Sequence, residues 1–268
     1  MTWDIAGHVV SDVGCVRELN EDRGRIVQPG DDGEQGRRGV LAIVADGMGG
    51  HSAGEVASEL AVDTVHRAYY ERDGAPGEAL VAALEHANRT IFETASAERR
   101  LAGMGTTCVA LAVCDGHAHA ASVGDSRLYL LRDGGIYRMT NDDSAVGELV
   151  ARGLLTRSEA RHHADRNVIL RALGTHHDVQ VSRWDQPLPV RSGDVFVLCS
   201  DGLSDLVEDE EIAELVTGQH GAEAAKALVT LARSRGGHDN ITVALVRITA
   251  HAAEPVAAPA TREVRVIR

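Results

Sequence analysis

The chain has 268 residues, of which 44% are hydrophobic and 25% charged, an ordinary globular composition that suits one large domain or two small ones. Its net charge of −13 argues against a nucleic-acid partner bound through a basic face. No apolar run approaches the ~20 residues of a membrane span, and the N-terminus lacks a signal-peptide profile, so we expect a cytoplasmic protein without membrane association.

Hydrophobic patterning predicts strands followed by two helices in the N-terminal part. Short strands are expected at 5–13 and 24–28, and the unbroken apolar run at 39–45 is typical of a strand buried on both faces. Apolar residues then recur at helical spacing from 56 to 69 and from 80 to 95. This spacing predicts two amphipathic helices.

Between residues 106 and 140 the hydrophobic period changes to that of strands. Short apolar runs are separated here by Asp-Gly or Gly-Asp pairs, which are a hairpin signal. We therefore expect consecutive hairpins that form one antiparallel sheet.

A polar, helical segment follows at 144–173, and its T-R-S-E sequence at 156–159 fits a capping box, so we interpret it as a surface flap. The order of the elements predicts an α+β fold with helices outside antiparallel sheets, in one domain over 1–250. The Ala- and Pro-containing tail at 251–268 is expected to be a mobile extension. The remaining elements are strands at 179–184, 195–200 and 241–248 and helices around 212–216 and 222–233.

The cysteines are scattered singly, without a C-x-x-C pair. Cys108, Cys114 and Cys199 lie inside apolar runs, where a thiol acts as a small core hydrophobe. This distribution favours structural thiols over zinc or redox chemistry.

Asp-Gly ends a buried apolar run at two places in the chain. The run at 40–45 ends at Asp46-Gly47, and the run at 195–199 ends at Asp201. For either pair alone a turn is as good an interpretation, because Asp and Gly are common turn residues. A third carboxylate, Asp239, directly precedes the predicted last strand. If that strand is antiparallel to the other two, all three carboxylates meet at one edge.

Gathered carboxylates repel one another unless a cation neutralises them. Oxygen ligands favour Mg²⁺ or Mn²⁺ over zinc, and the Gly47 carbonyl can approach a metal without a Cβ in the way. Near the N-terminus, Arg17 could bind a phosphate beside the metals, and His51 could protonate a leaving alkoxide. Alone, these two residues are better read as a surface ion pair and a turn residue at a helix start. Their occurrence together with the carboxylates favours a site.

Seven ordered motifs make the chain similar to a known family. They are SDVGCVRELNED, ADGMGGHSAGE, GMGTT, SVGDSRLY, RNVILRALG, LCSDGLSD and HDNITV. Over roughly residues 7–246 they resemble the metal-dependent serine/threonine protein phosphatases of type 2C (PPM) in their compact bacterial form. The resemblance implies a four-layer α-β-β-α sandwich of two antiparallel sheets flanked by helices, with a small helical flap.

The resemblance also implies a site with two Mn²⁺ or Mg²⁺ ions. In that site Asp46 would bridge both ions and the Gly47 carbonyl would bind one of them. Asp201 and Asp239 would complete the ligands of the first ion. The acidic pair Glu21 and Asp22 would hold the second ion, largely through ordered waters.

Further roles follow from the same resemblance. Arg17 would grip the substrate phosphate, His51 would be the general acid, and Asn240 would support Asp239. Asp125, in the G-D-S-R motif, would help Asp201 to hold a third, weaker metal, although hairpin turn chemistry explains Asp125 about as well.

The implied reaction is hydrolysis of phosphoserine and phosphothreonine in proteins by a water that the two metals activate. The implied partners are phosphorylated proteins, in particular a serine/threonine kinase and its substrates, and a monomer is expected. Two alternatives stay open: a catalytically weak phosphoprotein-binding module, and a phosphatase of regulatory domains such as anti-sigma-factor antagonists. Nucleotide binding by the glycine-rich loop is disfavoured because G-K-[ST] is missing.

The sequence departs from the family pattern at both borders of the flap. Asp143 stands where a His is usual, and Ala164 where a Pro is frequent, which puts flap motion and substrate preference in question more than the metal site. The pairs His162-His163 and His176-His177 are better explained as solvated helix-end residues than as metal ligands.

Overall fold

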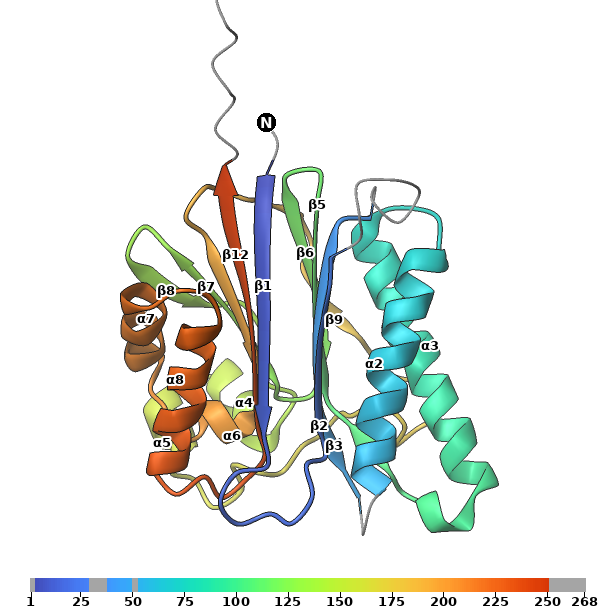
Figure 1. Ribbon diagram of the computed structural model, residues 1–268. Coiled ribbons are helices and arrows are strands. Elements are labelled where there is room, and N and C mark those ends of the chain that lie inside the picture. Colours follow the sequence, from blue (N-terminus) through green and yellow to red (C-terminus); the bar gives the residue numbers. More distant parts are fainter. Residues whose placement is uncertain (1–2, 29–37, 50–52, 251–268) are drawn as a thin grey trace, which may run out of the picture.

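A computed structural model describes residues 3–28, 38–49 and 53–250. Two antiparallel sheets pack face to face, and helices cover the outer face of each sheet (Figure 1). The layers therefore follow the order helix, sheet, sheet, helix. This arrangement confirms the predicted four-layer sandwich.

The first sheet has five strands in the order β1-β12-β11-β7-β8. All of its neighbouring strands are antiparallel. The strands are β1 (Trp3–Asp12), β12 (Ile241–Ala250), β11 (Val195–Cys199), β7 (Arg127–Arg132) and β8 (Gly135–Arg138).

Within the described ranges the second sheet has seven strands, and five of them follow the order β10-β6-β5-β3-β2. Two short strands lie off this path, because β4 pairs with β3 and β9 pairs with β6. The strands are β10 (Leu188–Pro189), β6 (His117–Val123), β5 (Cys108–Cys114), β3 (Val40–Met48), β2 (Asp22–Val27), β4 (Gly105–Thr106) and β9 (Ser182–Arg183).

Two long helices, α2 (Ala53–Glu71) and α3 (Pro76–Ala97), pack on the second sheet, and the short helix η1 (Arg99–Leu101) follows them. The first sheet is covered by α7 (Asp209–Gly218) and α8 (Gly221–Ser234), which follow the short α6 (Asp201–Ser204). The flap contributes α4 (Ala145–Ala151) and α5 (Arg157–Arg161). In Figure 1 these two helices lie near the lower end of the sandwich, beside α6.

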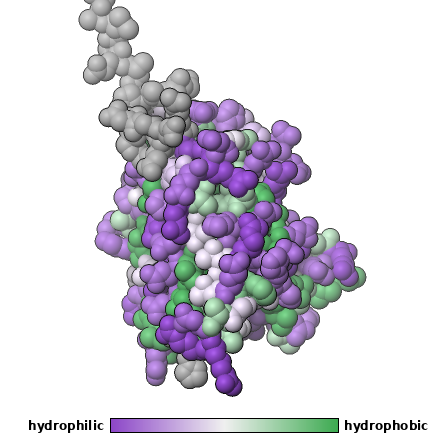
Figure 2. Space-filling model, turned by 90° about the vertical axis from the view of Figure 1, so that its right-hand side faces the viewer, coloured by the Kyte–Doolittle hydropathy of each residue, from purple (hydrophilic) through white to green (hydrophobic). Residues whose placement is uncertain are grey.

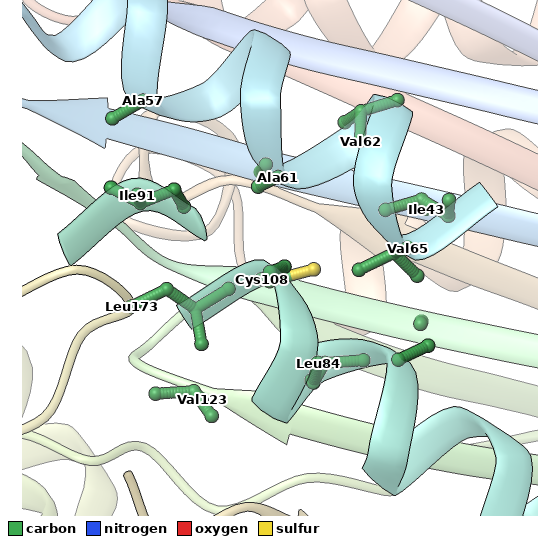
Figure 3. Close-up of a cluster of buried hydrophobic side chains, with 14 of the residues drawn as sticks. Ile43, Ala57, Ala61, Val62, Val65, Leu84, Ile91, Cys108, Val123 and Leu173 are labelled. Atoms are coloured by element: carbon green, nitrogen blue, oxygen red, sulfur yellow. The ribbon is translucent and has the colours of Figure 1, made fainter. Parts of the chain in front are cut away.

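Three hydrophobic clusters fill the spaces between the four layers. The side chains of β3 alternate between two of these clusters: Ile43 faces α2 and α3, whereas Val44 faces the other sheet. The continuous apolar run of β3 is explained by this burial on both faces. Figure 3 shows the helix side of this packing, where Ala57 and Ala61 of α2 lie on the same side as Ile91 of α3, and Leu173 lies beside Cys108.

The outer surface of α2 and α3 is turned towards the viewer in Figure 2, and hydrophilic residues are spread over it with small and hydrophobic residues between them. Among the residues that the structure describes, no helix combines the length and the apolar character needed to cross a membrane.

The prediction of one sheet made of consecutive hairpins is wrong. Hairpins do join β5 to β6 and β7 to β8, with left-handed backbone at Asp115-Gly116 and at Asp133-Gly134. At Gly124-Asp125, however, the chain crosses from β6 in one sheet to β7 in the other. Only Gly124 has positive φ there, whereas a type I′ hairpin turn needs positive φ at both central residues.

The flap and its surroundings are less regular than the sequence predicts. The predicted capping box is confirmed, because Thr156 and Glu159 each accept the other's backbone N–H. The predicted strand at 179–184 shrinks to the two residues of β9, and the helix α6 directly after β11 was not predicted. The expected mobile tail, 251–268, lies outside the described residues.

Candidate metal centre and active site

Asp46 lies inside β3, which continues to Met48, and so it does not end the strand as predicted. Its backbone is held on both sides by the segment at the start of β5. The Asp46 N–H donates to Thr107 Oγ1 (3.1 Å), and the Asp46 carbonyl accepts from the Thr107 N–H and from Thr106 Oγ1, both at 2.8 Å. These bonds fix the strand at the residue that carries the carboxylate.

Asp201 and Asp239 reach the same end of the first sheet, as predicted, because β11 and β12 are antiparallel neighbours. Asp201 is the first residue of α6, immediately after β11, and Asp239 stands shortly before β12. Asp46 comes from the facing sheet, so the site lies between the sheets and not along one sheet edge. Asp22 belongs to that facing sheet as well and is directly opposite Asp46 in the β2–β3 register.

Burial and mutual repulsion raise the pKa values of the clustered carboxylates. Burial, followed by the charges of Asp22 and Asp201, raises the pKa of Asp46 well above its ordinary value. Burial and then the charges of Asp125 and Asp205 do the same to the pKa of Asp201. Burial is also the main cause that raises the pKa of Asp22 to about 6 and the pKa of Asp125 to about 7. In the absence of a cation, these groups hold protons that an ordinary aspartate releases.

Several buried carboxylate oxygens of this cluster have no hydrogen-bond partner among the residues that the structure describes. Such oxygens are costly unless a ligand satisfies them, and an all-oxygen donor set suits Mg²⁺ or Mn²⁺. Within the described ranges no group of three or more His, Cys, Asp or Glu side chains is arranged closely enough to hold a metal ion as it stands. The unpartnered oxygens are Glu21 Oε1, Asp22 Oδ1, Asp125 Oδ1 and Asp201 Oδ1.

The glycines of the two Asp-Gly pairs permit close packing of backbone segments. A Cβ on Gly47 would lie 2.1 Å from the carbonyl oxygen of Gly54 at the start of α2, and a Cβ on Gly202 would lie 2.0 Å from that of Asn240. Neither residue has positive φ. The turn interpretation therefore fails for both pairs, since one lies in a strand and the other in a helix.

The loop between β1 and β2 carries Arg17 and Glu21 to the site. The Arg17 guanidinium donates to Asp239 Oδ2 at 2.9 Å, while half of its side chain remains exposed. Asn240 contacts Asp239 through its backbone N–H, which donates to Asp239 Oδ1 at 2.8 Å, while the Asn240 side chain holds the loop. Its Oδ1 accepts from the Glu21 N–H (2.8 Å), and its Nδ2 donates to the carbonyls of Val13 (3.0 Å) and Leu19 (2.9 Å).

No cysteine takes part in this cluster in the described part of the chain. Cys108, Cys114 and Cys199 are buried, and burial raises the pKa of Cys108 and Cys199 to about 12 and that of Cys114 to about 11. Cys15 is exposed. The predicted structural role of the three buried thiols is confirmed.

Comparison with known proteins identifies the family. The model of the family described as protein phosphatase 2C matches residues 24–234. The chain belongs to the protein phosphatase 2C family. It is therefore an enzyme, a metal-dependent protein-serine/threonine phosphatase, and the resemblance seen in its motifs is confirmed.

Two relatives within the protein phosphatase 2C family illustrate the similarity. The serine/threonine phosphatase stp of Listeria innocua is 38% identical over 247 residues, which cover 88% of this chain and 93% of that protein. The serine/threonine protein phosphatase PstP of Mycobacterium tuberculosis is 41% identical over 241 residues, which cover 89% of this chain but 44% of that longer protein.

Solved structures agree with the fold. The M. tuberculosis phosphatase PstP superposes with a TM-score of 0.81 at 38% identity, covering 92% of this chain and 99% of that one. The catalytic domain of a PstP in complex with two manganese ions gives a TM-score of 0.78 at 36% identity, covering 93% of this chain and all of that one. These protein phosphatase 2C structures support the two-sheet α+β architecture.

In this protein phosphatase 2C the flap covers a cavity of about 290 Å³ that opens beside the carboxylates. Asp125 and Asp201 line this cavity together with Asp205, a residue of the S-D-G-L-S-D motif for which the sequence analysis predicts no role. Asp125 belongs to the connection that crosses between the sheets, so the hairpin interpretation of this residue is wrong. Flap residues of α4 and α5 also line the cavity.

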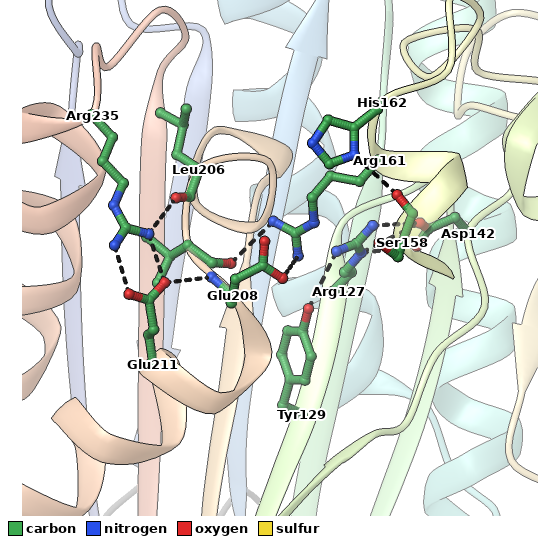
Figure 4. A network of polar contacts seen from close by, with 11 residues as sticks. Arg127, Tyr129, Asp142, Ser158, Arg161, His162, Leu206, Glu208, Glu211 and Arg235 are labelled. Atoms are coloured by element: carbon green, nitrogen blue, oxygen red, sulfur yellow. Dashed lines mark hydrogen bonds and ion pairs between the residues drawn. The ribbon is translucent and has the colours of Figure 1, made fainter. Parts of the chain in front are cut away.

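Figure 4 shows how the flap is joined to the helices of the first sheet. Arg161 of α5 pairs with Glu208 (3.1 Å), and the Glu208 backbone N–H donates to Glu211 of α7. Glu211 in turn binds Arg235 at 2.6 Å, just after α8. These contacts connect the flap to the segment that leads to Asp239.

The two histidine pairs singled out in the sequence make local contacts in the described part of the chain. His162 contacts the Ser158 carbonyl oxygen at 3.0 Å within its own helical turn, and His177 contacts the neighbouring Asp178 at 3.0 Å. His51, the predicted general acid, lies outside the described residues.

Proposed function

We propose that this enzyme hydrolyses phosphoserine and phosphothreonine with two divalent cations, Mn²⁺ or Mg²⁺, held between the sheets. The buried carboxylates with unpartnered oxygens are the observation that carries the proposal. Asp46 would serve both ions, with Asp201, Asp239 and the Gly47 carbonyl at the first ion. Glu21 and Asp22 would serve the second, and Asp125 with Asp201 a weaker third. When bound, the cations acidify water and neutralise charge on the phosphoryl group.

The chain's own residues orient this chemistry. Thr106 and Thr107 hold the Asp46 backbone, so its carboxylate is presented without a reorganisation cost. Asp22 Oδ2 accepts from Ser200 Oγ at 2.7 Å, which leaves Oδ1 free for an ion or a water. Preorganised ligands of this kind favour ionised carboxylates as soon as a cation enters.

Arg17 is proposed to bind the substrate phosphate. Its ion pair with Asp239 is half exposed, and exposed pairs contribute at most ~1 kcal/mol, so the guanidinium can leave Asp239 for a phosphate at little cost. Asp239 is thereby freed for an ion. His51 stays the proposed general acid.

The finer assignments concern partners. We propose that a serine/threonine kinase and its substrates supply the phosphorylated proteins, and that the catalytic domain over 1–250 acts as a cytoplasmic monomer. Against a catalytically weak binding module we weigh the buried carboxylates with unpartnered oxygens, because phosphoprotein binding alone does not need them.

The test is Mn²⁺-dependent phosphate release from a phosphothreonine peptide. Activity that disappears with a chelator and returns with excess Mn²⁺ supports the proposal. Tight binding of the peptide without turnover at any Mn²⁺ concentration would support the binding module instead.

A further inference from the structure

Asp143 begins the flap and is bonded twice to the turn between β6 and β7. Its backbone N–H donates to the Gly124 carbonyl at 2.9 Å, and its Oδ2 accepts from the Gly124 N–H at 3.1 Å. Its other carboxylate oxygen pairs with Arg171, at the far end of the flap. Asp143 itself is 5% exposed, whereas the Arg171 side chain is 40% exposed.

The two ends of the flap meet at the same residue. The Asp143 carbonyl accepts from the Leu170 N–H at 2.7 Å, and next to it the Ala145 N–H donates to the Val168 carbonyl at 2.8 Å. Residues 143–145 and 168–171 therefore form a closed base from which α4 and α5 project.

The turn that Asp143 holds leads directly into the metal centre. Asp125 follows Gly124, and the Ser126 hydroxyl lies 2.7 Å from Thr107 Oγ1, the atom that accepts the Asp46 N–H. Gly124 has φ of +102°, and a Cβ on it would lie 2.7 Å from Thr107. The turn and Thr107 thus have little room to move independently.

The C-terminal end of the flap is also connected to Asp46 by hydrogen bonds, through Leu173 and Thr106. Leu173 is buried in the cluster under α2 and α3 and exchanges two backbone hydrogen bonds with Thr106, at 3.0 and 2.8 Å. The Thr106 hydroxyl donates to the Asp46 carbonyl at 2.8 Å.

We infer that Asp143 is a positioning residue: its carboxylate fixes the base of the flap to the Gly124 turn and so sets the position of Asp125 and, through Thr107, of Asp46. The inference rests on the proposed metal site. It assigns a function to the flap-border residue at which the chain departs from the family pattern, and it links that border to metal binding.

Three substitutions, two at Asp143 and one at Arg171, distinguish the hydrogen bond of this carboxylate to Gly124 from its ion pair with Arg171. Asp143→Asn keeps an oxygen acceptor for the Gly124 N–H but loses the charge that pairs with Arg171. Asp143→Ala loses both, and Arg171→Met removes the ion pair without touching the Gly124 turn. The matched control is Arg191→Met, because Arg191 makes an exposed pair at 3.2 Å with Asp133 in the turn between β7 and β8, outside the flap.

The first measurement is Mn²⁺ binding by isothermal titration calorimetry on the full chain. Removal of residues that orient metal ligands typically costs roughly 10- to 100-fold in affinity. For Asp143→Ala we expect the affinity of the weakest Mn²⁺ site to fall by an amount in this range. For Asp143→Asn and Arg171→Met we expect a smaller loss of affinity at that site. Arg191→Met should bind Mn²⁺ like the wild type.

The second measurement is amide hydrogen exchange without metal, which does not depend on the proposed activity. In Asp143→Ala, exchange should accelerate in the flap and also at residues 124–126, whereas Asp143→Asn should retain protection of the Gly124 amide. Faster exchange confined to the flap would overturn the inference, because Asp143 would then anchor the flap alone.

The outcomes distinguish this inference from the proposed function. If the wild type neither binds Mn²⁺ nor hydrolyses phosphopeptides, the proposed function fails and the exchange data decide the role of Asp143. If the wild type depends on Mn²⁺ but all three variants match its affinity, only the positioning role is wrong. Should Asp143→Ala fail to fold, Arg171→Met and Asp143→Asn carry the same test.

Discussion

Asp22 and Asp46 occupy directly opposed positions on the antiparallel strands β2 and β3. Side chains at such positions start from Cβ atoms about 5 Å apart, and like charges there destabilise the sheet. The fold tolerates this pair because Ser200 bonds one oxygen of Asp22 and because protons or cations neutralise the remaining charge.

Metal-free protein is expected to lose stability as the pH rises from about 4 to about 7. An aspartate in the unfolded chain titrates near 3.9, whereas burial above all raises the pKa of Asp22 to about 6 and of Asp125 to about 7. Between these values the folded protein binds more protons than the unfolded chain, so the free energy of unfolding falls with rising pH. Denaturant titrations in a chelator at several pH values measure this.

Two additions make the pH experiment specific. Asp125→Asn removes one titrating group and should flatten the slope, and saturating Mn²⁺ should restore stability at neutral pH because it binds the ionised carboxylates. A metal-free stability that rises across the same window contradicts the proposed carboxylate cluster.

Asp46→Asn should reduce hydrolysis about 100-fold or more while the folded structure persists. A neutral amide cannot serve two cations, yet it can be buried without taking up a proton, so metal-free melting at neutral pH should shift upward. The control is Asp63→Asn on α2, which breaks an exposed pair with Arg25 (2.7 Å). Phosphopeptide turnover and circular dichroism test both variants, and near-normal turnover of Asp46→Asn would refute the metal assignment.

Arg17→Ala should raise KM for phosphopeptides with a smaller change in kcat, because the phosphate loses its guanidinium partner. Arg17→Lys should recover part of the loss, since a lysine keeps the charge without the planar fork. Steady-state kinetics with a phosphothreonine peptide decide the matter, and an unchanged KM in Arg17→Ala contradicts the phosphate role.

Asn240→Ala should produce a similar rise in KM although this residue touches no substrate. Three hydrogen bonds to the loop that carries Arg17 would be lost, and each unsatisfied buried group costs about 1–3 kcal/mol. The expected signature is lower stability together with the KM change. If Asn240→Ala is less stable but has the KM of the wild type, the prediction is wrong, because the loop then keeps its position without this side chain.

Gly47→Ala should severely impair folding or metal binding, because the new Cβ would lie 2.1 Å from a backbone carbonyl oxygen. Gly218→Ala is the matched control: it lies at the end of α7 with nothing within 4 Å, and alanine is favoured over glycine in a helix by roughly 0.5–1 kcal/mol. Thermal melts should therefore shift in opposite directions. A tolerated Gly47→Ala would argue against the close approach of β3 and α2.

The sequence predicts well what depends on local pattern. The apolar run of β3 predicts burial on both faces, and the T-R-S-E motif predicts a capping box. The structure contains both features. The meeting of Asp201 with Asp239 follows from two strands and their antiparallel order.

What the sequence misses depends on contacts between distant segments. Gly124-Asp125 looks like a hairpin turn, and only the pairing of β7 with β11 reveals the crossover. Asn240 and the β1–β2 loop lie more than 200 residues apart, so no local signal could show that its side chain holds this loop. The G-M-G-T-T motif was visible, but the bonds from Thr106 and Thr107 to Asp46 required the fold.

The buried thiols have a consequence for the enzyme under oxidative stress. Only the thiolate reacts readily with peroxides and alkylating agents, and thiols with pKa values of about 11 to 12 are almost entirely protonated in neutral solution. Dephosphorylation by this enzyme should therefore persist at peroxide levels that silence phosphatases with a cysteine nucleophile, so that oxidants would shift the balance between the two kinds of phosphatase.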